Sequence, residues 1–283
     1  MTHVLVSASE LATHLGDPRW RVVDCRHDLA DPGAGRRAFE AGHVPGALFA
    51  SLDGDLSGPA TPASGRHPLP DSATFVSRCR AWGISRDGAV VAYDASGGAW
   101  AARLWWLLAD HGHAAAYVLD GGLPAWLAAG GALQSGPAVA PPPGDFDGSP
   151  GHRPVVTAAE IASHSPVAWR LLDARDGPRY RGETEPVDAR AGHIPGALSA
   201  PFKESLAPDG RLLPPDALRA RFAALLAGRP PAEVVAYCGS GVTACHLLLA
   251  LEAAGLGAAR LYPGSWSEWI RDPTRPVRLG DEP

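Results

Sequence analysis

The sequence predicts an α/β protein made of two tandem domains of one design, each a mainly parallel sheet flanked by helices. Two observations predict this class. Short apolar runs alternate with helical patterns along the chain, which is typical of βα units whose strands are buried on both faces. The same motifs also occur twice in the same order, and the long spacing of this repeat indicates two domains instead of a solenoid of small units.

The internal repeat consists of four pairs of motifs. In chain order, Trp20 to Arg26 matches Trp169 to Arg175, Ala41 to Ala47 matches Ala191 to Ala197, Val90 to Asp94 matches Val234 to Cys238, and Tyr117 to Trp126 matches Leu261 to Trp269. A stretch rich in proline and glycine separates the copies and is typical of a semi-rigid linker. We predict an N-terminal domain over residues 1–136, a linker over 137–153 and a C-terminal domain over 154–283.

Several predicted helices begin with capping signals. Ser7 with Glu10, and Thr157 with Glu160, have the spacing of a capping box. Helices are also predicted over residues 71–82 and 216–226, where Asp71 and Asp216 would each cap the first turn. Residues 244–254 have the composition of a further helix.

The composition is that of a globular protein without a strong charge. The 283 residues are 46% hydrophobic and carry a formal net charge of −5, with a sequence pI of about 6.1. An acidic chain does not suit nucleic acid or an anionic membrane as its main partner. No apolar run reaches the length of a membrane span, and the first residues lack the pattern of a secretion signal. We expect a cytoplasmic protein with neither of these partners.

The four cysteines predict neither a metal site nor a disulfide framework. Cys25, Cys79, Cys238 and Cys245 form no Cys-x-x-Cys pair, and no histidines stand at ligand spacing from them. A chain of this size without a secretion signal is not expected to depend on disulfides. We expect four reduced thiols and no metal.

Cys238 is the exceptional thiol. It ends an apolar strand pattern and is followed by Gly239 and Gly241, which permit the tight loop that leads into the next helix. Backbone amides in such a loop point inward, and with the helix dipole they stabilise an anion, here the thiolate of Cys238. The alternative is a buried cysteine in an ordinary turn, and the Gly-x-Gly sequence favours the reactive thiol.

The repeat offers an internal comparison, because Asp94 stands in the first half where Cys238 stands in the second. An aspartate under the same amides would be a satisfied anion with a structural role. We therefore predict a single active site, in the C-terminal domain, with the N-terminal domain contributing packing and rim residues.

Together these motifs resemble those of the rhodanese superfamily in its two-domain form, the thiosulfate and 3-mercaptopyruvate sulfurtransferases. The resemblance covers essentially the whole chain and includes Ala-Gly-His-Val/Ile-Pro-Gly-Ala in both halves, Asp-Gly-Gly-Leu-Pro-Ala-Trp from Asp120 and Cys-Gly-Ser-Gly-Val-Thr from Cys238. It implies an enzyme without cofactor, in which Cys238 takes sulfur from a small donor as a persulfide and passes it to cyanide or a thiol, a thioredoxin-like reductant included.

The resemblance also implies residue roles. In the mercaptopyruvate enzymes, whose Cys-Gly-Ser-Gly-Val-Thr loop this chain shares, a serine joins a histidine and an aspartate in a proton relay. The matching residues are Ser240, His67 and Asp53. The expected substrate-binding residues are Arg179, Arg190 and the loop residues Gly239, Gly241, Val242 and Thr243. Val187 stands where several of these enzymes have a second arginine, so Arg190 is the candidate substitute and thiosulfate stays an alternative donor.

Other interpretations remain beside this one. His67 could be an ordinary surface histidine, and the repeated His43 and His193 are expected to be structural. A related cysteine phosphatase is disfavoured, because Ala244 stands where its loop needs an arginine. A persulfide carrier that delivers sulfur to one protein partner is the main non-enzymatic alternative.

Overall fold

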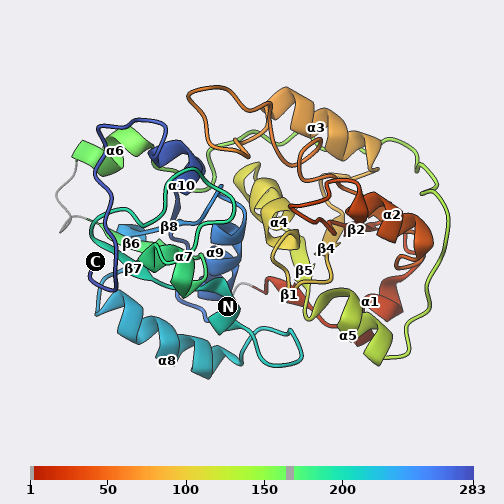
Figure 1. Ribbon diagram of the computed structural model, residues 1–283. Helices are drawn as coiled ribbons and strands as arrows, with labels where there is room; N and C mark the ends of the chain where they lie inside the picture. The colour runs from red at the N-terminus through yellow and green to blue at the C-terminus, as the bar shows by residue number, and fades with distance from the viewer. Residues whose placement is uncertain (1–2, 164–168) are drawn as a thin grey trace.

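The computed structural model describes residues 3–163 and 169–283, which form two parallel sheets side by side (Figure 1). The N-terminal sheet has the order β1-β5-β4-β2-β3 and comprises β1 (Leu5–Val6), β5 (Ala116–Leu119), β4 (Ala89–Tyr93), β2 (Trp20–Asp24) and β3 (Leu48–Phe49). The C-terminal sheet has the order β7-β6-β8-β9 and comprises β7 (Ala197–Ser199), β6 (Arg170–Asp173), β8 (Val234–Tyr237) and β9 (Arg260–Leu261). All named pairs are parallel, so the predicted fold class is confirmed.

Helices flank both sheets. The N-terminal half contains α1 (Ala8–His14), α2 (Ala34–Ala41), α3 (Ser72–Ala81), α4 (Ala101–Asp110) and α5 (Gly122–Ala128). The C-terminal half contains α6 (Ala158–Ser163), α7 (Gly177–Arg181), α8 (Pro215–Leu226), α9 (Thr243–Ala253) and α10 (Ser265–Trp269), with short 3₁₀ turns at Phe202–Ser205 and Pro231–Glu233. The predicted repeat of strand, loop and helix is therefore present in both halves.

One predicted helix cap is wrong. The side chains of Ser7, Thr157 and Asp71 accept the expected backbone N–H groups, from Glu10, Glu160 and Thr74 respectively. Asp216, however, does not cap α8, because the helix begins one residue earlier at Pro215. Proline suits the first helical position, where its fixed φ fits the helix and its missing N–H is not needed. Asp216 instead pairs with Arg219 one turn later.

The two halves share a buried core. Helices α4 and α9 lie against each other at the centre of the molecule (Figure 1). A single cluster of buried apolar residues runs through both, from Trp105 in α4 to Leu248 in α9. Phe146 of the intervening segment also packs into this cluster. None of the described helices combines the length and hydropathy that crossing a membrane requires.

Candidate active site

Cys238 lies in a tight loop between the end of β8 and the start of α9. Its side chain is buried, and the backbone N–H of Gly241 donates to its Sγ at 3.2 Å. Gly241 has a φ of +77°, and a Cβ at this position would collide with the carbonyl of Pro263. Glycine is therefore required here, both for the backbone conformation and for the close approach of the neighbouring chain.

Residues at the start of α10 form hydrogen bonds with the backbone of this loop. The N–H of Trp266 donates to the carbonyl of Cys238 at 3.0 Å, and the N–H of Ser267 donates to that of Gly239 at 2.9 Å. The N–H of Cys238 donates to Ser265 Oγ at 3.1 Å. The carbonyl oxygens of Cys238 and Gly239 therefore accept hydrogen bonds from α10 and do not point at the sulfur.

The matching loop of the N-terminal half surrounds Asp94. Its Oδ1 accepts the N–H groups of Ser96 and Gly98 at 2.7 and 2.9 Å, and its Oδ2 accepts those of Trp100 and Ala101 at 2.8 and 2.9 Å. Asp94 is fully buried. Four charge-assisted bonds satisfy the carboxylate, as predicted for an aspartate in this position.

The structure brings the three predicted relay residues together. His67 Nδ1 lies 2.8 Å from Ser240 Oγ, and His67 Nε2 lies 3.2 Å from Asp53 Oδ1. Burial, with the positive charge of Arg66 beside it, lowers the pKa of His67 to about 4. The ring is therefore neutral at pH 7, and the contact with Ser240 favours Nδ1 as acceptor of the hydroxyl, which leaves the proton on Nε2, the nitrogen that faces Asp53. His67 is buried, so its interpretation as a surface histidine is wrong.

His67 reaches the loop because its own segment is packed on α10. A Cβ on Gly65 would collide with the carbonyl of Gly264, so the two backbones touch. The N–H of Arg66 donates to Ser267 Oγ at 3.0 Å. The segment from Gly65 to His67 is thus fixed against the opposite half, which holds His67 and Arg66 at the cysteine loop.

Arg103 of α4 connects the Cys238 loop with the segment that contains His67. Its side chain is fully buried and donates to the carbonyls of Gly241, His67, Pro68 and Leu56 at 3.0 to 3.2 Å. Among the described residues no carboxylate forms an ion pair with it. This buried guanidinium places a positive charge close to the Cys238 loop.

A pocket of about 300 Å³ opens in front of the loop, and both halves line it. Trp100 comes from the N-terminal half and Phe202 from the C-terminal half. The predicted residues Gly239, Val242 and Thr243 also line it, as do four basic side chains, those of Arg66, Arg175, Arg179 and Lys203. The lining also contains one carboxylate, that of Asp176, which pairs with Lys203 at 3.0 Å, so the guanidinium groups are the donors offered to an anionic substrate.

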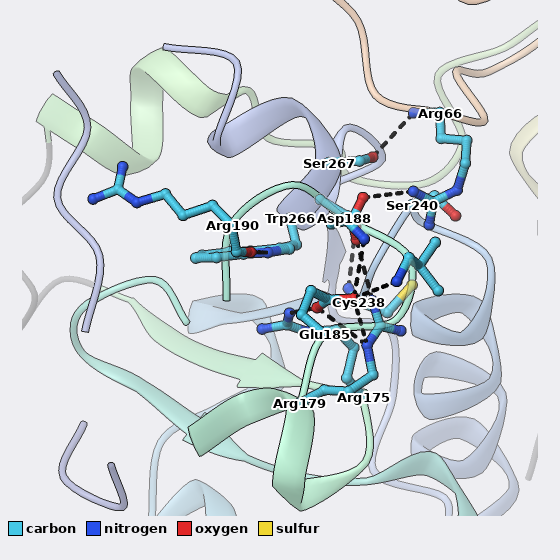
Figure 2. Close-up of polar contacts among 12 residues, drawn as sticks. Arg66, Arg175, Arg179, Glu185, Asp188, Arg190, Cys238, Ser240, Trp266 and Ser267 are labelled. Atoms are coloured by element: carbon cyan, nitrogen blue, oxygen red, sulfur yellow. Dashed lines mark hydrogen bonds and ion pairs between the residues drawn. The ribbon is translucent and has the colours of Figure 1, made fainter. Parts of the chain in front are cut away.

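Figure 2 shows how Arg179 is held beside the loop. Its guanidinium binds both carboxylate oxygens of Glu185, at 2.7 to 3.2 Å, and Asp188 Oδ2 at 3.1 Å. Asp188 Oδ1 in turn accepts Arg66 Nη1 at 2.6 Å. Arg175 donates to Glu185 and lies over the Trp266 ring, at 4.7 Å from its centre. Arg179 therefore lies at the pocket, and its binding of substrate stays a prediction.

Arg190, the other predicted substrate-binding arginine, is not among the residues that line the pocket. Its backbone carbonyl accepts the indole N–H of Trp266 at 2.8 Å, which fixes the backbone. Its side chain points away from Cys238 and its Nη1 lies 3.4 Å from the carbonyl of Arg275 (Figure 2). The basic residue at the loop is instead Arg66, which sequence reasoning missed although it directly precedes His67.

The repeated histidines have the expected structural contacts. His43 stacks on Phe39 and its Nδ1 lies 2.7 Å from the Phe39 carbonyl. His193 stacks on Tyr180 and its Nδ1 lies 2.8 Å from the Tyr180 carbonyl. Neither contact involves the cysteine loop.

The other three thiols do not line the pocket, and burial raises the pKa of Cys25, of Cys79 and of Cys245, the last to about 12. The Cys245 thiol donates to the carbonyl of Gly241 at 3.3 Å. These three cysteines are therefore protonated and unreactive at neutral pH.

Comparison with known proteins identifies the family. The rhodanese-like domain family matches residues 7–129 and 157–272. The chain is 53% identical to "Probable 3-mercaptopyruvate sulfurtransferase" of Pseudomonas aeruginosa, over 98% of both chains. It is 44% identical, over 98% of this chain and 97% of the relative, to a protein of Mycobacterium tuberculosis described as a candidate thiosulfate sulfurtransferase. The structure of a 3-mercaptopyruvate sulfurtransferase from Leishmania major matches with a TM-score of 0.85 and 34% identity, covering 95% of this chain and 74% of that one. The chain therefore belongs to the rhodanese family, with two rhodanese-like domains.

Proposed function

We propose that this protein is a sulfurtransferase that moves sulfur from 3-mercaptopyruvate to a thiophilic acceptor through a persulfide on Cys238. The observation that carries the proposal is the contact of Ser240 with His67 at 2.8 Å, next to Cys238 and a basic pocket. A proton relay suits a donor whose thiol must lose a proton and whose carbon must gain one. The relative that is 53% identical supports the same donor.

In the first half-reaction the Cys238 thiolate attacks the sulfur of mercaptopyruvate. A sulfur–sulfur bond forms, the carbon–sulfur bond breaks, and its electron pair leaves with carbon as the enolate of pyruvate. The thiol proton of the donor is then added to this carbon, which gives pyruvate and a Cys238 persulfide anion. Arg179 would bind the carboxylate of the donor, and the N–H of Gly241 would stabilise the charge on sulfur.

The relay residues would carry that proton. Ser240 is the member nearest the pocket, and neutral His67 can accept its proton at Nδ1 while Asp53 orients the ring through Nε2. Because His67 is neutral at pH 7, it can take up the donor's thiol proton and return it to the enolate. Transfer by a positioned group of this kind contributes roughly 10²- to 10⁴-fold to a rate.

In the second half-reaction cyanide or a thiol, including the thiol of a thioredoxin-like protein, attacks the outer sulfur of the persulfide. Cys238 leaves as its thiolate and the cycle closes. Within this proposal residues 154–283 form the catalytic domain, residues 137–153 link the domains, and residues 1–136 form a non-catalytic domain that supplies His67 and Asp53.

Thiosulfate is the second candidate donor. The relative that is 44% identical favours it, as do the basic side chains in the pocket, which suit a doubly charged donor. A side-by-side measurement of kcat/KM for both donors, with cyanide and with a small thiol as acceptor, tests the proposal. We expect mercaptopyruvate to be preferred, with multiple turnovers. A tenfold preference for thiosulfate would contradict the assigned donor, and one bound sulfur without turnover would indicate a carrier.

A further inference from the structure

Arg103 is a buried cation that the reaction steps given above do not use. It belongs to α4 of the N-terminal half, is fully buried and is not among the residues that line the pocket. Its Nη1 donates to the carbonyl of Gly241 at 3.0 Å, and the N–H of the same Gly241 donates to Cys238 Sγ at 3.2 Å. A single residue therefore connects this guanidinium with the sulfur.

The charge of Arg103 has no carboxylate to compensate it, in contrast to the basic side chains of the pocket. Among the described residues no Asp or Glu forms an ion pair with Arg103, which donates to carbonyl oxygens. The pocket cations each have such a partner: Arg66 pairs with Asp188, Arg175 with Asp173, Arg179 with Glu185 and Lys203 with Asp176. An arginine keeps its charge at neutral pH even where burial lowers its pKa, so Arg103 places an uncompensated positive charge at the loop.

The repeat provides an internal comparison for this contact. Gly97 follows Asp94 at the same distance along the chain as Gly241 follows Cys238, and both glycines have a positive φ, +68° and +77°. The carbonyl of Gly97 also meets a side chain from the central helix of the other half, since His246 Nε2 of α9 lies 3.0 Å from it. Burial lowers the pKa of His246 to about 4, so this residue is neutral at pH 7. The two loops are thus held in the same way, but a charged residue is present only at the cysteine.

The sulfur has more need of that charge than the carboxylate has. Asp94 accepts four backbone N–H groups, whereas Cys238 Sγ accepts one. Negative charge on Cys245 or Cys238 would act against the lowering of the pKa of Arg103, so both sulfurs lie within electrostatic range of the guanidinium. Burial raises the pKa of Cys245 to about 12 and keeps that thiol protonated, which leaves Cys238 as the sulfur that can use the charge. Water does not screen a fully buried charge, so its effect on a nearby anion is large.

We propose that Arg103 is a positioning residue that acts through Gly241 and whose buried positive charge, supplied by the N-terminal half, stabilises the sulfur anion of Cys238. This inference rests on the proposed function only in taking Cys238 as the nucleophile, and it holds for any sulfur donor. The charge favours the thiolate that attacks the donor and the thiolate that leaves when the acceptor takes the sulfur. Because Arg103 also donates to the carbonyl of His67 at 3.1 Å, the same side chain fixes the relay histidine relative to the cysteine loop.

The test measures the reactivity of Cys238 without a sulfur donor. The full-length protein is treated with iodoacetamide at pH 7, and the rate of alkylation at Cys238 is followed by mass spectrometry. We expect Arg103→Gln to slow this reaction about tenfold, because the thiolate is the form that reacts. Arg103→Lys keeps a positive charge and should stay within about threefold of the parent. His246→Gln, the matched control, changes the corresponding contact at the Asp94 loop and should stay within about twofold.

The direction of the change separates this role from a merely structural one. Cys238 is buried, and Cys245 donates its thiol proton to the carbonyl that Arg103 also binds. A loop that was only loosened by Arg103→Gln would expose Cys238 and raise its alkylation rate, with Cys245 alkylated as well. An unchanged or faster reaction at Cys238 would therefore overturn the proposal. If Arg103→Gln does not fold, Arg103→Lys decides, because a loss of about tenfold or more in that variant would exclude a role for the charge.

Steady-state kinetics with mercaptopyruvate provide a second measurement. Arg103→Gln should lower kcat about tenfold and change KM less than about threefold, since Arg103 does not line the pocket. A higher KM with an unchanged kcat would place Arg103 in substrate binding and contradict the proposal. A parent protein whose Cys238 is alkylated faster than that of Arg103→Gln, but which does not turn over mercaptopyruvate, would contradict the proposed function and support the role of Arg103.

Discussion

The loops around Asp94 and Cys238 have the same position in their sheets and different tasks. Each loop follows a strand with a neighbour on both sides, β4 or β8, and leads into the next helix, α4 or α9. The Asp94 carboxylate takes four backbone N–H groups, whereas the Cys238 sulfur takes one, from Gly241, and adjoins a pocket. One scaffold thus holds either a carboxylate with four backbone donors or a thiol that faces a pocket.

Each half of the chain also supplies a segment that packs at the Cys238 or Asp94 loop of the other half. Two segments that both begin Gly-Arg lie at these loops: Gly65-Arg66-His67 at the Cys238 loop and Gly210-Arg211-Leu212 at the Asp94 loop. A Cβ on Gly97 of the Asp94 loop would lie 3.2 Å from the carbonyl of Gly210. Leu212 stands where His67 stands in the other copy. The Asp94 side therefore lacks the nucleophile and has no histidine at the position of His67.

Replacing Cys238 by serine should have the largest effect on activity. A serine hydroxyl cannot form a persulfide, so we expect sulfur transfer to fall at least about 1,000-fold. Steady-state assays with mercaptopyruvate and cyanide measure this, and circular dichroism checks the fold. Appreciable activity in the variant would refute the role of Cys238.

Placing the cysteine in the Asp94 loop tests whether the structure of the loop alone is sufficient for sulfur transfer. We expect Asp94→Cys in the Cys238→Ser background to give no sulfur transfer, because Leu212 replaces the relay histidine there. The loss of the carboxylate leaves four buried N–H groups without a charged acceptor, which should lower the free energy of unfolding by about 3 kcal/mol or more. Chemical denaturation measures the second effect. A persulfide on the thiol introduced by Asp94→Cys would show that the loop alone creates the site.

Replacing His67, the proposed relay base, tests what distinguishes the Cys238 loop from the Asp94 loop. We expect His67→Gln to lower kcat for mercaptopyruvate about 100-fold, since no group then moves the proton. Asp53→Asn should cost only about tenfold, because the side chain of Asp53 is 46% exposed and only orients the ring. If His67→Gln left the rate and its pH dependence unchanged, the relay would be excluded.

A further prediction concerns stability in acid. His246 of α9 lies 3.0 Å, through Nε2, from the carbonyl of Gly97 in the Asp94 loop, and burial lowers its pKa to about 4 from the ordinary 6.5. Between these values the unfolded chain binds the extra proton, so the free energy of unfolding decreases as pH falls from 6.5 toward 4. His67 acts in the same direction. Each histidine contributes a slope of roughly 1.4 kcal/mol per pH unit.

Denaturation curves at several pH values between 4 and 7.5 measure this slope. His246→Gln should flatten it relative to the parent protein. A slope unchanged by the substitution would show that His246 is not the group that titrates on unfolding.

The sequence was sufficient for what depends on local pattern and on the repeat. The fold class, the position of Cys238 in a tight loop after its strand and the satisfied carboxylate of Asp94 all follow from strand, loop and helix signals that appear twice. It was insufficient where side chains cross between the halves. Arg66 and Arg103 give no local signal of their contacts with the Cys238 loop, and Arg190 was chosen by chain position, whereas the Trp266 indole fixes its backbone with the side chain outward.

The most direct test of a single reactive loop is to locate the transferred sulfur. The protein is incubated with mercaptopyruvate without acceptor, alkylated under conditions that preserve persulfides, digested and analysed by mass spectrometry. We predict one additional sulfur atom per chain, on Cys238 alone, which is released when cyanide is added. Sulfur on Cys25, Cys79 or Cys245, or none on Cys238, would contradict the account.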